Sequence, residues 1–178
     1  FQHLKYGIYV PVETQDFVLT GKEQKDGGCI VNTVQQVTQN PLRISVAVNK
    51  GNFTHEIIMK TGQFNVSVLQ KDVPFEIFER FGFVTGRDTD KFKDFPCVKR
   101  SENGIYYLTQ FANAFISGKV IETIDCETHT VFIASVTEAQ VLSDKESVTY
   151  QYYFDNISVI SSSCNNFCPH WLNNSDYP

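Results

Sequence analysis

The sequence lacks the features that mark several large classes of protein. Its 178 residues carry a formal net charge of −5 and include no run of Lys and Arg, so a nucleic-acid-binding surface is not expected. No apolar stretch approaches the roughly 20 residues that a membrane-spanning helix requires. The start of the chain also lacks the apolar segment of a secretion signal. These absences favour a cytoplasmic protein with neither a membrane nor a nucleic acid as its partner.

Cysteine is sparse, and its spacing gives no disulfide framework. The count of five is odd, and Cys29, Cys97 and Cys126 each stand alone in apolar surroundings, which predicts buried free thiols. The segment Cys164-Asn-Asn-Phe-Cys168-Pro-His170 offers three possible ligands, whereas tetrahedral zinc takes four. We therefore expect no metal site and a tail that carries free thiols.

The residues that are abundant favour β-structure. Phe occurs 15 times and Tyr 8 times, beside many Val, Ile and Thr, which are the residue types enriched in strands. Two short helices are predicted at 54–62 and 72–82, capped by Thr54 and Asp72. Alternating apolar residues predict strands at 6–10, 14–20, 29–38, 43–49, 63–69, 105–108, 112–124 and 128–142.

These elements predict a single domain at residues 1–158, followed by a tail at 159–178. Seven or so strands with two inserted helices indicate an antiparallel barrel or sandwich. The last residues are rich in Ser, Asn, Cys and Pro, a composition typical of a loosely ordered tail or a docking arm.

The stretch from Gly27 to His55 has more polar side chains than a strand pair in a core needs. It reads as two strands joined by a turn at Asn40-Pro41. Buried amides and hydroxyls are costly unless they find hydrogen-bond partners. Either one face of the pair is solvated, or a bound polar molecule supplies the partners, and we favour the bound molecule. The polar side chains of the first strand are Asn32, Thr33, Gln35, Gln36 and Thr38.

Several segments resemble, in the same order, the motifs of the flavin reductase-like, FMN-binding split-barrel family. The resemblance covers about residues 4 to 154 and is closest to a branch found in anaerobes, in which the domain stands alone or precedes a rubredoxin module. The matching segments are Gly28-Cys-Ile-Val-Asn-Thr-Val-Gln-Gln-Val-Thr38, Asn40-Pro41, Val46-Ala-Val-Asn-Lys50, Asn52-Phe-Thr-His55, Thr61-Gly-Gln-Phe-Asn-Val-Ser-Val-Leu69, Phe81-Gly-Phe-Val-Thr-Gly-Arg-Asp-Thr-Asp-Lys-Phe92 and Thr128-His-Thr-Val-Phe-Ile133.

The resemblance implies a mainly β fold, a six-stranded antiparallel Greek-key split barrel with short inserted helices. It also implies a homodimer that holds FMN noncovalently near the subunit interface. NADH or NADPH would deliver a hydride to the flavin, and the electrons would pass to an acceptor. Because the flavin carries this chemistry, no HExxH motif, P-loop or nucleophile–base pair is needed, and the sequence contains no convincing one.

Two functions remain open at this point. One is an NAD(P)H-dependent flavin reductase, and the other is a non-enzymatic FMN carrier, of the flavoredoxin kind, that shuttles electrons between redox proteins. A split barrel that binds haem or a pyridoxal-type cofactor is a third class. A rubredoxin module would need two CxxC pairs, which the tail lacks, so no iron centre is expected.

The resemblance also implies the residues of the site. It places the flavin ring against one strand and the ribityl and phosphate groups at the end of the next. Arg87 and Lys91 are the expected phosphate cations, although an ordinary solvated loop would carry the same residues. His129 is the expected catalytic residue near flavin and nicotinamide, with Glu-Thr before it where the family has Gly-Asp. The expected flavin-binding residues are Asn32, Thr33, Val34, Gln36, Val37, Thr38, Asn49, Lys50, Asn52, Thr54, Arg87 and Lys91.

Overall fold

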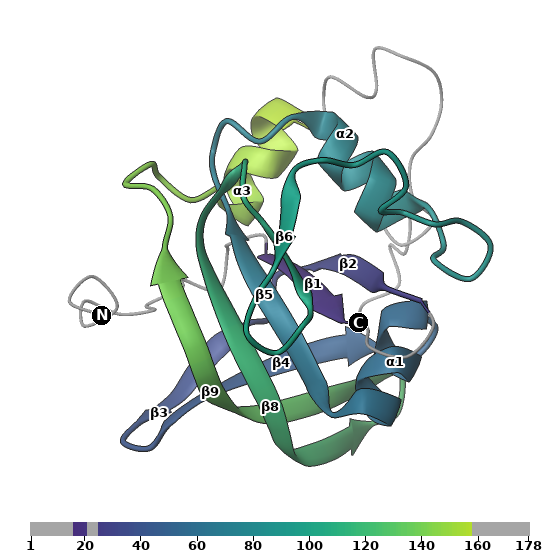
Figure 1. Ribbon diagram of the computed structural model, residues 1–178, viewed down its shortest axis with the longest axis vertical. Coiled ribbons are helices and arrows are strands. Elements are labelled where there is room, and N and C mark those ends of the chain that lie inside the picture. The colour runs from purple at the N-terminus through teal and green to yellow at the C-terminus, as the bar shows by residue number, and fades with distance from the viewer. Residues whose placement is uncertain (1–15, 21–24, 158–178) are drawn as a thin grey trace, which may run out of the picture.

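The computed structural model describes residues 16–20 and 25–157, and the predictions for the strand at 6–10 and for the tail at 159–178 lie outside them. Seven strands form one curved antiparallel sheet around which the rest of the chain is arranged, and two more form a small ladder (Figure 1). The prediction of a mainly β fold is confirmed. The strands of the main sheet are β1 Asp16–Thr20, β2 Gly27–Val31, β3 Gln35–Gln39, β4 Leu42–Asn49, β5 Gln63–Leu69, β8 Ala112–Cys126 and β9 His129–Val141, and those of the ladder are β6 Val98–Arg100 and β7 Tyr106–Leu108.

The prediction of one continuous strand at 29–38 is wrong, because the chain changes its partner within that stretch. β2 pairs with β1, whereas β3 pairs with β4, and residues 32–34 separate them. The order of the sheet is β2-β1-β5-β8-β9-β4-β3, so the two strands at its edges follow one another in the chain. The sheet therefore curves until its edges adjoin, and it has seven strands where six were expected.

Thr33 bridges the break between β2 and β3. Its hydroxyl donates to the carbonyl of Ala47 at 2.8 Å and accepts from the amide of Ala47 at 3.1 Å. One side chain thus supplies both hydrogen bonds that a neighbouring strand would give to β4 at that residue.

The interior of the barrel is filled by alternate residues of its strands. Val46 of β4 lies opposite Phe132 of β9 in the register, and both are buried. At Gly118 of β8 a Cβ atom would lie 3.0 Å from the ring of Phe64. This position therefore has no room for a larger residue. Each buried Val, Ile or Phe side chain contributes about 1.5–3 kcal/mol. The other large members of this core include Ile44, Val48, Ile58, Val66 and Ile116.

Helix α1 spans Phe53–Thr61 and closes one end of the barrel. It begins one residue before Thr54, since Asn52 is the N-cap. It ends at Gly62, as predicted, where a φ of 65° suits glycine and the amide donates to Ile58 O at 2.8 Å. No helix in the described part of the chain is long and apolar enough to cross a membrane.

The aromatic segments form a second core outside the barrel. Helix α2, Phe75–Phe78, continues into a π-turn at Glu79–Phe83, and its N-cap is Pro74 where Asp72 was expected. A further short helix, α3 Tyr150–Tyr152, leads into another π-turn at Tyr153–Ile157. These helices pack together through buried side chains, among them Phe78, Phe81, Ile105, Leu108, Val148 and Tyr153.

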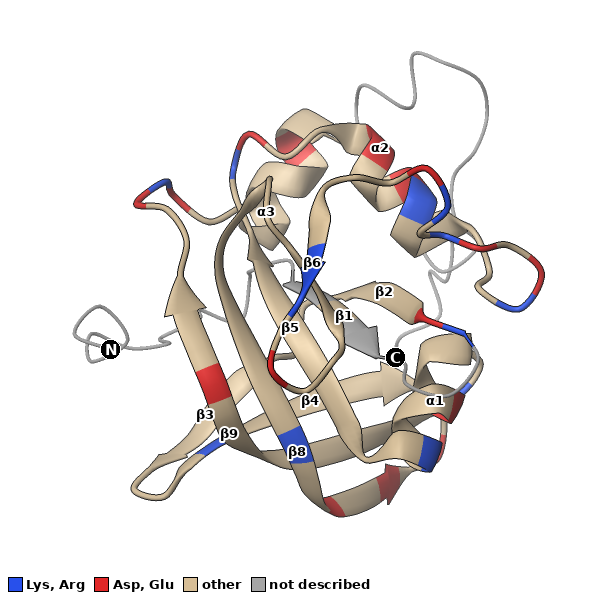
Figure 2. Ribbon diagram, in the orientation of Figure 1, with Lys and Arg blue, Asp and Glu red and all other residues tan. Residues whose placement is uncertain are grey.

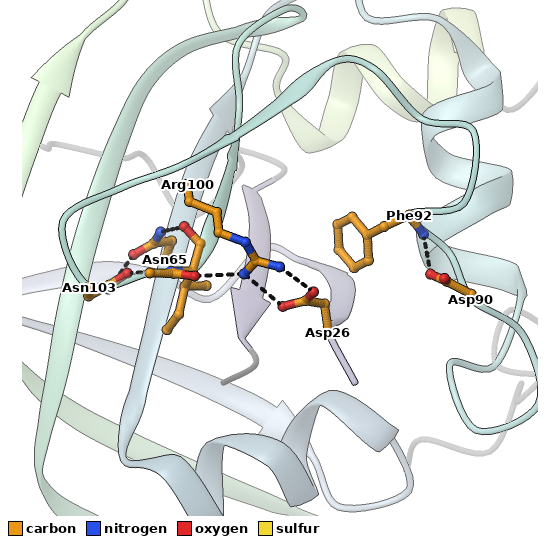
Figure 3. Close-up of polar contacts among 8 residues, drawn as sticks. Asp26, Asn65, Asp90, Phe92, Arg100 and Asn103 are labelled. Atoms are coloured by element: carbon orange, nitrogen blue, oxygen red, sulfur yellow. Dashed lines mark hydrogen bonds and ion pairs between the residues drawn. The ribbon is translucent and has the colours of Figure 1, made fainter. Parts of the chain in front are cut away.

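Figure 3 shows how the β6–β7 hairpin is held across the barrel. Asn65 of β5 is fully buried and donates through Nδ2 to Ser101 Oγ at 2.8 Å and to the carbonyl of Ile105 at 3.0 Å, while its carbonyl accepts from Asn103. Arg100 pairs with Asp26 at 2.8 Å. Because a buried amide is stable only when it is paired, Asn65 fixes where this hairpin lies.

Two aromatic rings connect the hairpin to the loop that precedes it. The ring of Phe92 stacks on Tyr106 with centroids 5.1 Å apart, and Figure 3 shows that ring on the side that faces Asp26. The amide of Phe92 donates to Asp90 Oδ1 at 2.9 Å. The loop from η2, at 79–83, to β6 is thereby packed against β7.

Candidate functional site

A pocket of about 240 Å³ lies where β2, the N-terminus of α1 and the segment after α2 meet. Its lining comes from parts of the chain that are far apart in sequence, at 28–30, 51–54, 81–86 and Lys91. Figure 2 shows that the loop after α2 carries both basic and acidic residues, whereas the strands of the barrel carry few of either. Ile30, Phe53, Phe81 and Phe83 contribute to the lining, but most of the surface that the pocket exposes is polar.

Lys91 is the only charged residue among the described residues that line the pocket. Its side chain is 5% exposed, and its ammonium group donates to the carbonyls of Gly28 and Phe81, both at 3.0 Å. An ammonium group has three N–H donors, so one is left for an acceptor in the pocket. Burial lowers the pKa of Lys91 from 10.5 to about 8. This group can hold an anion at neutral pH and can release its proton in mild alkali.

The N-terminus of α1 adds a second source of positive potential. The backbone amide of Asn52 donates to the carbonyl of Asn49 at 3.0 Å. Its side-chain amide makes no capping hydrogen bond and can reach a molecule in the pocket. Thr54, in the first turn, is 3% exposed and also lines the pocket. Helix N-termini attract anions through their amide groups and the helix dipole. Together with Lys91, this end of α1 gives the pocket a positive potential, which suits an anionic group.

Cys29 lies beside these groups but is not reactive. Burial raises the pKa of its thiol to about 11, which outweighs the hydrogen bond with the Thr54 hydroxyl and the charge of Lys91 that favour the thiolate. The raised pKa favours the protonated thiol at neutral pH and makes Cys29 a poor candidate for a thiolate nucleophile. Cys29 is buried as expected, whereas Cys97 is only partly buried and Cys126 is exposed, so that prediction was wrong for Cys126. No group of His, Cys, Asp or Glu in residues 16–20 and 25–157 could hold a metal ion.

Arg87 lies at the rim of the pocket and does not line it. Its guanidinium group forms an ion pair with Glu56, and this hydrogen bond lowers the pKa of the Glu56 carboxyl. The guanidinium also lies 5.8 Å from the centroid of the Phe53 ring, and Lys25 Nζ lies 5.5 Å from it. Lys25 donates to the carbonyl of Arg87 at 2.6 Å.

A separate polar group lies where β4 ends and β9 begins. Asn49 and His129 are partners in the β4–β9 register, and Lys50 pairs with Asp125 at 2.6 Å. His129 Nδ1 lies 2.9 Å from the Thr128 hydroxyl. None of the members lines the pocket.

His55 has no definite role in the sequence-based prediction. Its Nε2 lies 2.8 Å from the Thr130 hydroxyl and its ring packs on Phe132. Burial lowers the pKa of His55, which favours the neutral imidazole, and the contact ties α1 to the barrel.

The residues expected to contact the flavin ring are largely engaged within the chain. Val34 is 3% exposed and belongs to the core. Gln36 Nε2 donates to the Thr38 carbonyl at 3.4 Å, and the Thr38 hydroxyl donates to the carbonyl of Pro41. Figure 1 shows the β3–β4 hairpin on the side of the barrel opposite α1. Asn32 is half-buried at the break and Val37 is 49% exposed.

Of the residues expected from the sequence, the structure brings Asn52, Thr54 and Lys91 together in one pocket, with Arg87 at its rim. The others lie at the β4–β9 end or along the β2–β3 stretch. Sequence reasoning missed the apolar residues of the pocket's lining and the backbone of Gly28. The segment Phe81-Gly-Phe-Val-Thr-Gly86 belonged to a quoted motif, yet only the cations that follow it were selected.

Comparison with known proteins supports a single family. The family model described as flavin reductase like domain matches residues 12–161. The chain is 39% identical over 150 residues to the high molecular weight rubredoxin of Moorella thermoacetica, a match over 84% of this chain but only 62% of that protein, which is less than two thirds. It is 37% identical over 153 residues to the ferric-chelate reductase (NAD(P)H) of Archaeoglobus fulgidus, covering 86% of each chain.

A solved structure shows the same fold. The FMN-binding protein from Thermus thermophilus superposes with a TM-score of 0.67 at 19% identity, over 76% of this chain and 75% of that one. At this identity the likeness concerns the fold alone, whereas the family match extends over most of the sequence. The chain therefore belongs to the flavin reductase-like family.

Proposed function

We propose that this protein binds FMN noncovalently and catalyses its reduction by NADH or NADPH, passing the electrons to an acceptor. The observation that carries the proposal is the buried Lys91 at the N-terminus of α1, within segments that match the family. The ferric-chelate reductase of Archaeoglobus fulgidus is named for NAD(P)H as its donor, and the Thermus thermophilus protein is named for FMN.

The pocket fits the phosphate end of FMN. Lys91 has one free donor, the first turn of α1 is positive, and Asn52 offers its side-chain amide. Its volume of about 240 Å³ is below the roughly 300–1,000 Å³ of a complete small-molecule site. The isoalloxazine ring would therefore extend out of the pocket past Ile30 toward the break at 32–34, where Thr33 is one of its proposed contacts.

The exposed ring would need a cover, which supports a homodimer. The outer surface of the barrel exposes apolar side chains, with Val37 and Ile124 both 49% exposed. A second copy packed there would exclude water from the flavin. With β2 and β3 counted as one bent strand, the same sheet is a six-stranded barrel, and we propose the Greek-key split barrel on that basis.

Bound flavin supplies the hydride and electron chemistry, so this chain has to bind, orient and shield. Lys91 and α1 would fix the phosphate. His129, which is partly exposed beside Asn49, would orient the nicotinamide or stabilise the reduced ring by hydrogen bonding. The ferric-chelate reductase name and the rubredoxin name of the two relatives suggest an iron chelate or a redox protein as the acceptor.

Stopped-flow reduction of the FMN-loaded protein tests this function. Loss of the oxidised-flavin absorbance after anaerobic mixing with NADH or NADPH should be fast enough to support turnover with one of them. If reduction is slow with both, but a reduced redox protein still loads the flavin with electrons, the protein is an electron carrier of the flavoredoxin kind.

A further inference from the structure

The loop at 84–91 forms one wall of the pocket and is held at two places of different character. Val84, Thr85, Gly86 and Lys91 all line the pocket. At Lys91 the loop is anchored by buried hydrogen bonds to two backbone carbonyls. At the other place, the rim, it is held by Arg87, whose side chain is 45% exposed.

Most of the rim contacts join this loop to α1, and Lys25 also donates a hydrogen bond to the carbonyl of Arg87. Arg87 pairs with Glu56 in the first turn of the helix and lies over the ring of Phe53. A Cβ atom at Gly86 would lie 3.1 Å from Phe53 Cδ1, so the loop backbone rests on the same ring. Neither Arg87 nor Glu56 lines the pocket. The pair therefore joins two walls of the pocket from outside.

We propose that Glu56 is a positioning residue for the cofactor, which by pairing with Arg87 holds the loop 84–91 against α1 and so limits the release of FMN. This inference rests on the proposed function, because it assumes that FMN occupies the pocket. The pair would shift the balance between a flavin that is retained and one that exchanges.

The contacts at the rim are of the kind that opens readily. Ion pairs between exposed side chains contribute little to stability and are weakened by salt. The buried Lys91 anchor stays in place while the rim parts, so the loop would swing about its Lys91 end. Loss of the rim pair should speed FMN release by about two- to fivefold, and high salt should do the same to the wild type.

The direction of the change in FMN release in Glu56→Gln distinguishes a closing contact from direct binding of the phosphate by Arg87. If Arg87 contacted the phosphate directly, Glu56 would compete with the phosphate for it, and Glu56→Gln would slow release. Removal of a negative charge near a helix N-terminus also favours a bound anion. Faster release in Glu56→Gln would oppose both of these electrostatic effects, and only a closing contact predicts it.

The experiment measures the rate of FMN release by flavin fluorescence after rapid dilution of the loaded protein. Glu56→Gln is compared with Glu146→Gln, which removes an exposed ion pair with Lys71 of 3.0 Å away from the pocket. We expect faster release only in Glu56→Gln, and recovery of slow release in the charge-swapped pair Glu56→Arg with Arg87→Glu. Thermal unfolding of the flavin-free variants checks that the fold is unchanged.

Slower or unchanged release in Glu56→Gln would overturn the proposal, and so would equal effects of the two Gln variants. If Glu56→Gln does not fold, the wild-type response to salt decides, and release that is independent of salt overturns it. A wild-type protein that does not bind FMN would instead refute the proposed function.

Discussion

The pocket beside α1 and the β3–β4 hairpin both contain polar residues that the sequence predicts to bind flavin. The hydrogen bonds of these residues differ between the two regions. In the hairpin, the Thr38 hydroxyl and the Gln36 amide bond to carbonyls two or three residues away. In the pocket, Lys91 reaches carbonyls 63 and 10 residues away and keeps a donor unused. Polar groups that are satisfied locally support the backbone, whereas polar groups assembled from distant segments with capacity left over indicate a ligand.

The largest effect is expected from Lys91→Met. A hydrogen bond to a charged group contributes about 1.5–3 kcal/mol, so the dissociation constant of FMN should rise by roughly 10- to 150-fold. The flavin-free protein should also lose some stability, because the carbonyls of Gly28 and Phe81 lose their hydrogen bonds with the ammonium group. The cost of burying that group offsets part of the loss. Fluorescence titration measures the affinity, and Lys93→Met, an exposed residue of the same loop, is the matched control.

Riboflavin distinguishes the phosphate from the ring in that experiment. Because riboflavin has no phosphate, its affinity should be equal in wild type and Lys91→Met. An equal loss of affinity for both flavins would show that Lys91 does not act on the phosphate.

The pH dependence of FMN binding is the next largest effect. Since the pKa of Lys91 in the folded protein is about 8 and its ordinary value is 10.5, the ammonium is present below pH 8 and lost above it. FMN affinity should fall by up to about tenfold per pH unit above 8. Between pH 8 and 10 the unfolded chain binds more protons than the folded one, so the Lys91 contribution to stability of the flavin-free protein should rise.

Measurements of FMN affinity and of the stability of the flavin-free protein over pH 7–10 test these predictions, since affinity should fall while the Lys91 contribution to stability rises. Lys91→Arg stays charged throughout this range, so its FMN affinity should lack the step near pH 8. A step of the same size in the Arg variant would assign the titration to another group.

The contrast also shows what the sequence could and could not reveal. Periodicity located β4, β5, β8 and β9 to within a few residues, because alternation of buried and exposed side chains is local. The break at 32–34 was not predicted, because it arises from a change of pairing partner: β2 pairs with β1, whereas β3 pairs with β4. For the same reason Lys91 was named as a cation, but neither its burial nor its carbonyl partners followed from its neighbours in sequence.

Thr33→Val should affect stability more than flavin binding. The substitution removes both hydrogen bonds to Ala47 at the break between β2 and β3. Each bond contributes about 1 kcal/mol at most, because water can reach this exposed residue. We expect a loss of about 1 kcal/mol in urea unfolding. Thr38→Val, which removes one hydrogen bond within the hairpin, should cost less. The reverse order would mean that the break does not depend on Thr33.

The smallest effect is expected from Gln36→Ala. Its amide bonds weakly, at 3.4 Å, within its own hairpin. Figure 1 shows this hairpin on the side of the barrel opposite α1, the helix whose first residues line the pocket. The free energy of unfolding should change by less than about 0.5 kcal/mol, and FMN affinity of a single chain by less than about twofold. If a second copy brings the hairpin against a flavin, however, the loss of affinity should appear only at protein concentrations that favour the dimer. FMN titration of Gln36→Ala and wild type at low and high protein concentration separates the two cases. A loss of affinity at every concentration would place Gln36 against the flavin of its own chain and remove the distinction between the pocket and the hairpin.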